Sequence, residues 1–85
     1  MKTAPNTVLY SGDNIRIEIN HVKNGIEIYF SERPSEQEVV KILHRNKFKF
    51  YAAKKCWYMN NRPSTRAAAL QIFELLNKQK TRKEM

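Results

Sequence analysis

The sequence predicts a single α+β domain in which an antiparallel sheet carries two helices on one face. Residues 15–20 and 26–30 alternate strictly between apolar and polar side chains, as half-buried antiparallel strands do. Residues 47–60 repeat this alternation with aromatic and basic side chains on either side of a turn. Amphipathic segments at 36–46 and 67–76 predict two helices, which gives the element order ββαββα.

The chain of 85 residues is long enough for one hydrophobic core and too short for two independent ones. We expect this domain over residues 14–77. We interpret residues 1–13 as a flexible arm, with a short edge strand at residues 7–10 as the alternative, and residues 78–85 as a basic, disordered tail.

The first hairpin has Asn24-Gly25, a strong turn signal, between its strands. A tight turn at this dipeptide would pair Lys23 with Ile26 on the apolar face. A four-residue loop, residues 22–25, instead pairs Ile19 with Ile28, and we prefer it because register follows burial. The inward side chains are then Ile15, Ile17, Ile19, Ile26, Ile28 and Phe30.

The first helix is predicted over residues 36–46, after Pro34 ends the preceding strand. Ser35 and Glu38 have the spacing of a capping box, in which each side chain bonds to the other residue's backbone N–H. The buried stripe of this helix comprises Val39, Val40, Ile42 and Leu43. Because the helix is short, packing rather than intrinsic propensity must stabilise it.

The second hairpin is predicted to pair Phe50 with Trp57 and Phe48 with Met59 on its inner face, with residues 52–55 as the loop. Its outer face then has Lys49 opposite Tyr58. Tyr51 and Cys56 lie side by side there, and the Cys56 thiol has no neighbouring base to activate it. Trp57 is therefore expected in the core rather than on a ligand.

The second helix is expected to have Pro63 in its first turn, where a missing backbone N–H costs least. Asn61, Arg62 and Ser64 all remain candidates for its N-cap. Its buried side comprises Ala69, Leu70, Ile72, Phe73 and Leu76. The sheet face opposite the helices would be open to solvent and would carry Arg16, Tyr29, Lys47, Lys49, Tyr51 and Tyr58.

The formal net charge of +8 is unevenly distributed along the chain. Residues 1–38 have a net charge of −2, residues 39–73 have eight basic residues and no acidic one, and residues 74–85 have a net charge of +2. A cluster of positive charge is typical of a polyanion-binding surface, and nucleic-acid phosphates are the commonest polyanion.

The residues that chemistry would require are missing, so we expect neither an enzyme, nor a metal site, nor a cofactor. Cys56 is the only cysteine, and His21 and His44 lack a partner at ligand or triad spacing. Two glycines, Gly12 and Gly25, do not make a phosphate-binding loop. The chain shows neither a signal peptide nor a membrane span, which predicts a soluble, cytoplasmic protein that does not contact membranes.

The candidate binding residues combine phosphate-neutralising charges with rings that can stack on unpaired bases. They are Lys47, Lys49, Tyr51, Lys54, Lys55, Tyr58, Arg62 and Arg66. Tyr29 is a weaker candidate because Glu18 and Glu27 lie near it in the predicted sheet. Single-stranded and double-stranded nucleic acid both remain open as ligands.

The segments GIEIYFSERPSEQEVVKIL and FKFYAAKKCWYM carry a resemblance. A strand that ends at a proline, a helix and an aromatic, basic hairpin before a Trp-Tyr pair resemble a small module of phage and plasmid proteins. They are more distantly similar to the HARP domain of annealing helicases. The resemblance covers residues 25–76 and implies association with DNA rather than RNA. The family form often has Gly and Arg where this chain has Asn46 and Lys47.

A protein-interaction module, or a phage-type inhibitor whose basic face binds an acidic protein surface, is the alternative function. A homodimer formed through the open sheet face is a third hypothesis, but the lysines on that face favour a monomer. The expected partner is therefore nucleic acid, with a protein partner as the second choice.

Overall fold

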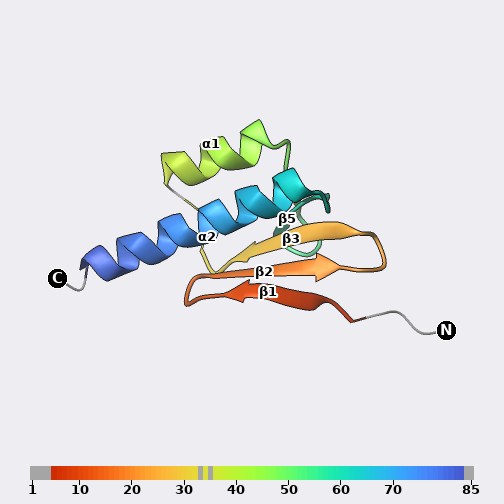
Figure 1. The fold of residues 1–85 in the computed structure, drawn as a ribbon, viewed down its shortest axis with the longest axis horizontal. Coiled ribbons are helices and arrows are strands. Elements are labelled where there is room, and N and C mark those ends of the chain that lie inside the picture. The colour runs from red at the N-terminus through yellow and green to blue at the C-terminus, as the bar shows by residue number, and fades with distance from the viewer. Residues whose placement is uncertain (1–4, 33, 35, 84–85) are drawn as a thin grey trace.

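The computed structural model describes residues 5–32, 34 and 36–83, with the side chains of the last helix described as far as residue 76. Five strands and two helices follow one another along this described part of the chain (Figure 1). They are β1 (Thr7–Ser11), β2 (Ile15–Asn20), β3 (Gly25–Phe30), α1 (Gln37–Arg45), β4 (Lys49–Tyr51), β5 (Cys56–Asn60) and α2 (Pro63–Lys83). The predicted α+β class is confirmed, with one more strand than the predicted element order contains.

The sheet has the strand order β1-β2-β3-β5-β4, and every neighbouring pair is antiparallel. For the N-terminal segment, the sequence left a flexible arm and a short edge strand at residues 7–10 as alternatives. The structure has the edge strand, β1, at residues 7–11. The pairing of β1 with β2 is interrupted by a bulge between Val8 and Tyr10. Because β5 pairs with both β3 and β4, the short strand β4 forms the other edge of the sheet.

The predicted register of the first hairpin is wrong by two residues. Ile19 lies opposite Ile26, and Ile17 lies opposite Ile28, so the four-residue loop is 21–24 rather than 22–25. Asn24 adopts a left-handed conformation with φ 53°, which leaves Gly25 to begin β3. A shift of two residues keeps every side chain on the same face, so the burial pattern could not distinguish the two registers.

The predicted register of the second hairpin is confirmed for the three pairs of β4 and β5. Lys49 lies opposite Tyr58, Phe50 opposite Trp57 and Tyr51 opposite Cys56, with residues 52–55 as the turn. The expected burial of Phe50 is wrong, because 54 % of this residue is exposed at the sheet edge. Phe48 is buried but precedes β4, so its predicted strand pairing with Met59 is not observed.

Helix α1 begins one residue later than the predicted capping box requires. Its N-cap is Glu36, which makes no side-chain capping hydrogen bond, and Ser35 lies outside the described residues. Val39, Ile42 and Leu43 are buried as expected, whereas Val40 is only partly buried. Since α1 lacks a side-chain cap at its start, its apolar face must contribute most of its stability.

The end of α1 is a Schellman motif, in which backbone N–H groups bond to the last helical carbonyl groups. The Lys47 N–H donates to the His44 carbonyl at 3.1 Å, and the Phe48 N–H donates to the Leu43 carbonyl at 2.9 Å. Lys47 therefore lies between helix and strand with φ 63°, a conformation that usually requires glycine. Its predicted position on the open sheet face is wrong.

We expect Lys47→Gly to raise the free energy of unfolding by about 0.5–1 kcal/mol, because glycine adopts the left-handed conformation without steric cost. Urea denaturation would measure the change. Lys47→Ala is the matched control, since it removes the same charge and keeps a Cβ. If both variants changed stability equally, the backbone conformation of Lys47 would not be the cause.

Helix α2 begins at Pro63, which confirms Pro63 in the first turn. Of the three candidate caps, Arg62 occupies the N-cap position, since its carbonyl group accepts the Arg66 N–H. The Thr65 hydroxyl accepts a hydrogen bond from the Arg62 N–H at 2.9 Å and lies 2.6 Å from the Asn60 carbonyl oxygen, to which it can donate. The helix continues to Lys83, so the segment expected to be a disordered tail is helical as far as that residue. Within the described residues, no helix has the length and apolar character needed to cross a membrane.

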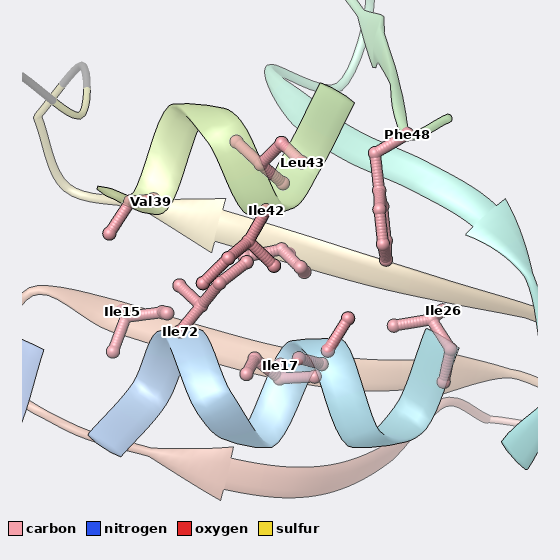
Figure 2. Packing of buried hydrophobic residues seen from close by; sticks show 11 residues of the cluster. Ile15, Ile17, Ile26, Val39, Ile42, Leu43, Phe48 and Ile72 are labelled. Carbon is pink, nitrogen blue, oxygen red and sulfur yellow. The ribbon is translucent and has the colours of Figure 1, made fainter. Parts of the chain in front are cut away.

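One hydrophobic core joins the two helices to one face of the sheet. Figure 2 shows Ile72 of α2 and Ile42 of α1 among the isoleucines of the central strands. Ile17, Ile26 and Ile28 have no exposed surface. Phe73 and Leu76 are partly buried against this core, and Leu70 is partly buried as well. Trp57 and Met59 also pack against the core while remaining partly exposed, as expected for an inward face near the sheet edge.

Candidate nucleic-acid interface

The face of the sheet opposite this core, here called the outer face, carries the side chains that alternate with the buried isoleucines. Strand pairing places Glu27 between Glu18 and Tyr58, and Tyr29 between Arg16 and Cys56. The same alternation places Lys49 and Tyr51 of β4 on this face beside β5. Two of the predicted rings, Tyr51 and Tyr58, therefore lie on one surface, with Lys49 directly opposite Tyr58.

The rings of Tyr51 and Tyr58 are positioned by the loop between β2 and β3. The Lys23 ammonium nitrogen lies 5.7 Å from the centroid of the Tyr51 ring, within the range of a cation–π contact. The Tyr58 hydroxyl lies 3.4 Å from the Lys23 carbonyl oxygen, to which it can donate. Tyr51 is 45 % exposed, so much of this side chain is accessible to a ligand. Lys23 was not among the predicted binding residues.

The Tyr58 ring lies directly over Gly25 in β3. A Cβ at Gly25 would lie 2.2 Å from Cε1 of Tyr58, which is closer than two carbon atoms can approach. The sequence suggested that Gly25 is a turn residue. In the structure it is the first residue of β3, and its missing side chain leaves space for the Tyr58 ring.

We expect Gly25→Ala to displace the Tyr58 ring from the outer face and to lower the free energy of unfolding by about 1–2 kcal/mol. The NMR chemical shifts of the Tyr58 ring would report the displacement, and urea denaturation would report the stability. Gly12→Ala, in the turn between β1 and β2, is the control. Unchanged ring shifts in Gly25→Ala would contradict the close contact.

A buried carboxylate lies at the centre of the outer face. Glu27 is only 2 % exposed, although the helices pack with the isoleucines of the opposite face. Its Oε1 accepts hydrogen bonds from the Asn6 amide at 3.0 Å and from the Tyr29 hydroxyl at 2.8 Å. Its Oε2 accepts from the Asn20 amide at 3.0 Å and from the Lys54 ammonium at 3.1 Å. These four donors replace the water that the carboxylate loses on burial.

The environment of Glu27 favours its ionised form. Burial raises the pKa of the carboxyl group, but the hydrogen bonds from Asn20, Tyr29 and Lys54 outweigh burial, and the pKa lies below its ordinary value. The hydrogen bond to Glu27 correspondingly raises the pKa of Lys54. Burial, together with the bond to Glu27, raises the pKa of Tyr29, so its hydroxyl remains a donor. The centre of the face is thus an ionised carboxylate with fixed partners.

The second carboxylate of the outer face, Glu18, is also paired. It accepts a hydrogen bond from the Arg16 guanidinium and another from the Asn6 amide at 2.9 Å. The Arg16 guanidinium carbon lies 4.7 Å from the centroid of the Tyr29 ring. The Tyr29 ring is therefore in contact with Arg16 on one side, and its hydroxyl is bonded to Glu27.

Cys56 lies on the outer face beside Tyr51, as predicted, but it is fully buried. Burial, together with the nearby Glu27 carboxylate, raises the pKa of the thiol. A buried thiol with a raised pKa is a weak nucleophile. We therefore interpret Cys56 as a packing residue between its strand neighbours Tyr29 and Tyr51.

The structure separates the eight predicted binding residues into groups, and Lys47 lies apart from the outer face, between α1 and β4. Lys49, Tyr51 and Tyr58 share the outer face, and Lys54 reaches it from the turn through its ion pair with Glu27. Lys55 is exposed at the end of the same turn with φ 56°. Arg62 and Arg66 lie at the start of α2, where the Arg66 guanidinium donates to the Asn61 side-chain oxygen at 2.7 Å.

Sequence reasoning missed the Glu27 network and the contribution of Lys23. Glu27 in the middle of an alternating strand indicated such a network. A carboxylate on a central strand is shielded from water by both neighbouring strands and therefore needs hydrogen-bond donors from the protein. The sequence did not reveal that Lys54, which is distant along the chain, supplies one of them. Among the residues that the structure describes, no group of three or more His, Cys, Asp or Glu could hold a metal ion.

Comparisons with models of known protein families, with curated proteins and with solved structures give no match to this chain. The site is therefore assigned from its residues, and the resemblance to HARP domains remains an expectation.

Proposed function

We propose that this chain is a small module that binds single-stranded nucleic acid on the outer face of its sheet. The observation that carries the proposal is the arrangement of Lys49, Tyr51 and Tyr58 on one exposed surface, with Lys23 beside the Tyr51 ring. Exposed rings on a sheet offer stacking surfaces to unpaired bases, whereas the bases of a duplex are already stacked. The lysines would neutralise the phosphates between those bases.

The carboxylates on the same face are compatible with this proposal. Glu18 and Glu27 are paired with Arg16 and Lys54, so each negative charge has a positive partner within the face. Phosphates would therefore meet the positive charges of Lys23, Lys49 and Lys55, which have no ion pair among the described residues. The acid-free segment 39–73 supplies two of these three lysines.

In the proposed function the module is a monomer that acts without catalysis and without a cofactor. We favour DNA over RNA as the ligand because of the resemblance of residues 25–76 to modules of DNA-processing proteins in mobile elements. A cytoplasmic location accompanies this proposal. The protein-interaction alternative is supported by a different surface, described below.

A salt series tests the proposal. Fluorescence anisotropy with labelled oligo-dT, the matching oligo-rU and a duplex of equal length should show the tightest binding for oligo-dT. About three neutralised phosphates would give a slope of roughly −2 in a plot of log K against log salt concentration. Absence of binding at low salt, or a slope near zero, would overturn the proposal. Tighter binding of the duplex would reject the stacking geometry.

A further inference from the structure

Strand β4 has an open backbone edge. Among the strands that the structure describes, its only neighbour is β5, and its three side chains, Lys49, Phe50 and Tyr51, are all exposed. An unpaired strand edge can accept another strand through main-chain hydrogen bonds, which is why proteins usually cover or shorten such edges. The edge of β4 is short and has one lysine, but no described strand pairs with it and its three residues are exposed.

An apolar groove lies directly inside this edge, between the β4–β5 hairpin and α1. It has a volume of about 710 Å³ and is lined mainly by Phe30, Pro34, Val40, Phe50, Ala52 and Trp57. The Phe50 and Trp57 rings meet edge to face, with their centroids 5.5 Å apart, and form one wall. Val40 of α1 is partly exposed because it faces this groove instead of the core.

The edge and the groove together fit an extended segment with alternating side chains. In a strand added beside β4, successive side chains would point alternately to the helix side and to the outer face. Residues on the helix side would enter the groove beside Phe50. Residues on the outer side would lie next to Lys49, and the ends of the segment would approach Lys47 and Lys55, which flank β4 and its turn.

We propose that the β4 edge and this groove bind an extended segment of a partner protein in which apolar residues alternate with Asp or Glu. Strand addition provides affinity through main-chain hydrogen bonds, and the groove provides selectivity through the alternate side chains. The charge complementarity comes from Lys47, Lys49 and Lys55. A second copy of this chain is a poor occupant, because two β4 edges would bring two sets of lysines together without acidic partners.

Nucleic acid fits the outer face better than it fits this groove. The groove is lined by apolar side chains with Lys55 as its only cation among the described lining residues, and Glu32 lies at its rim. A phosphate backbone would therefore find little charge neutralisation there. This inference rests on the groove and the strand edge rather than on the tyrosines of the proposed nucleic-acid site, and the two sites share Lys49 and Lys55.

Trp57 is the only tryptophan, so its fluorescence reports directly on the groove. The probe is a synthetic seven-residue peptide, EFDLEVD, in which apolar and acidic residues alternate. We expect it to shift the Trp57 emission in a saturable manner and to change the NMR amide signals of Lys49, Phe50 and Val40. A peptide of the same composition with its apolar residues adjacent, FLVEEDD, should bind at least about tenfold more weakly.

Two further comparisons separate strand addition from unspecific apolar contact. A copy of the alternating peptide with N-methylated amides along one edge cannot form the main-chain hydrogen bonds and should lose binding. Phe50→Ala should weaken binding at least about tenfold, and it should leave the fold intact because Phe50 is exposed.

The proposal is overturned if the alternating peptide causes no saturable change, or if the scrambled or N-methylated peptide binds equally well. It is also overturned if oligo-dT, rather than the peptide, changes the signals of Trp57 and Val40. If oligo-dT changes the NMR signals of Tyr51 and Tyr58 alone, the nucleic-acid site is supported. The peptide titration then decides the strand-addition proposal.

Discussion

Glu27→Gln should lower the free energy of unfolding by about 2–3 kcal/mol, because hydrogen bonds to a charged acceptor are each worth about 1.5–3 kcal/mol. The carboxylate accepts four hydrogen bonds, two at each oxygen. A glutamine amide would present N–H groups to one of these pairs of donors. Tyr29 or Asn20 would then lose its acceptor within a buried site. Urea denaturation at neutral pH would measure the change.

The same carboxylate should make the stability depend on acid pH. The pKa of Glu27 is lower in the folded protein than its ordinary value, so the unfolded chain binds the proton more readily. Its stabilising contribution is therefore complete above the ordinary carboxyl pKa of about 4.3 and is lost as the pH falls through the lower folded pKa. As the pH falls from neutral into the acid range, we expect the free energy of unfolding to decrease less in Glu27→Gln than in the native protein, because glutamine does not titrate.

Glu74→Gln is the matched control, since Glu74 is exposed on α2 and should change stability by less than about 0.5 kcal/mol. Lys54→Met separates the ion pair from the remaining network. Its effect should be smaller than that of Glu27→Gln, because the carboxylate keeps its three other donors and the ion pair is screened at the Lys54 side chain, which is 43 % exposed. A Glu27→Gln variant as stable as the native protein would show that the network is dispensable.

The Lys49→Ala/Tyr51→Ala double variant should weaken binding of oligo-dT by roughly 30- to 1000-fold, or about 2–4 kcal/mol. Loss of the Tyr51 ring removes one stacking surface, and loss of Lys49 removes one phosphate contact. The salt slope should become less steep by about 0.7. Anisotropy titration over a salt series measures both effects, and the fold should persist because both side chains are exposed.

Lys41→Ala/Phe50→Ala is the control for this variant. It also removes one cation and one exposed ring, but from α1 and from the groove side of β4. Oligo-dT binding should change by less than about threefold in this control. If both double variants weakened binding equally, net charge rather than the arrangement on the outer face would explain the affinity.

The residue that is most prominent in the family resemblance does not lie in the proposed nucleic-acid site. The resemblance rests on the hairpin of aromatic and basic residues before Trp57, yet that side chain faces the groove and the core. Tyr51 and Tyr58, which flank it in the pattern, lie on the outer face. The nucleic-acid proposal therefore uses the tyrosines on the outer face of this hairpin, whereas the peptide proposal uses the groove on its other face and the β4 edge, where the two sites share Lys49.

The alternation of side chains by itself determined which residues share a face of the sheet. Side chains in a strand point to opposite faces in turn, so the inward isoleucines and the outward Lys49, Tyr51 and Tyr58 could be predicted from spacing. The same alternation predicted the pairing of Phe50 with Trp57, and with it the four-residue turn at 52–55. Pro63 could be predicted in the first turn of α2, because proline is suited to that turn, but the N-cap stayed open among Asn61, Arg62 and Ser64.

Only the tertiary structure decided which strands are neighbours and which side chains meet across them. Alternation contains no information about strand order, so the edge position of β4, and with it the exposure of Phe50, could not be predicted. The pairing of β5 with β3 brings Lys54 to Glu27, although the two residues are far apart in the sequence. One lysine of the predicted binding set is therefore a structural partner of a buried carboxylate, because a charge removed from water requires a compensating charge or hydrogen bonds.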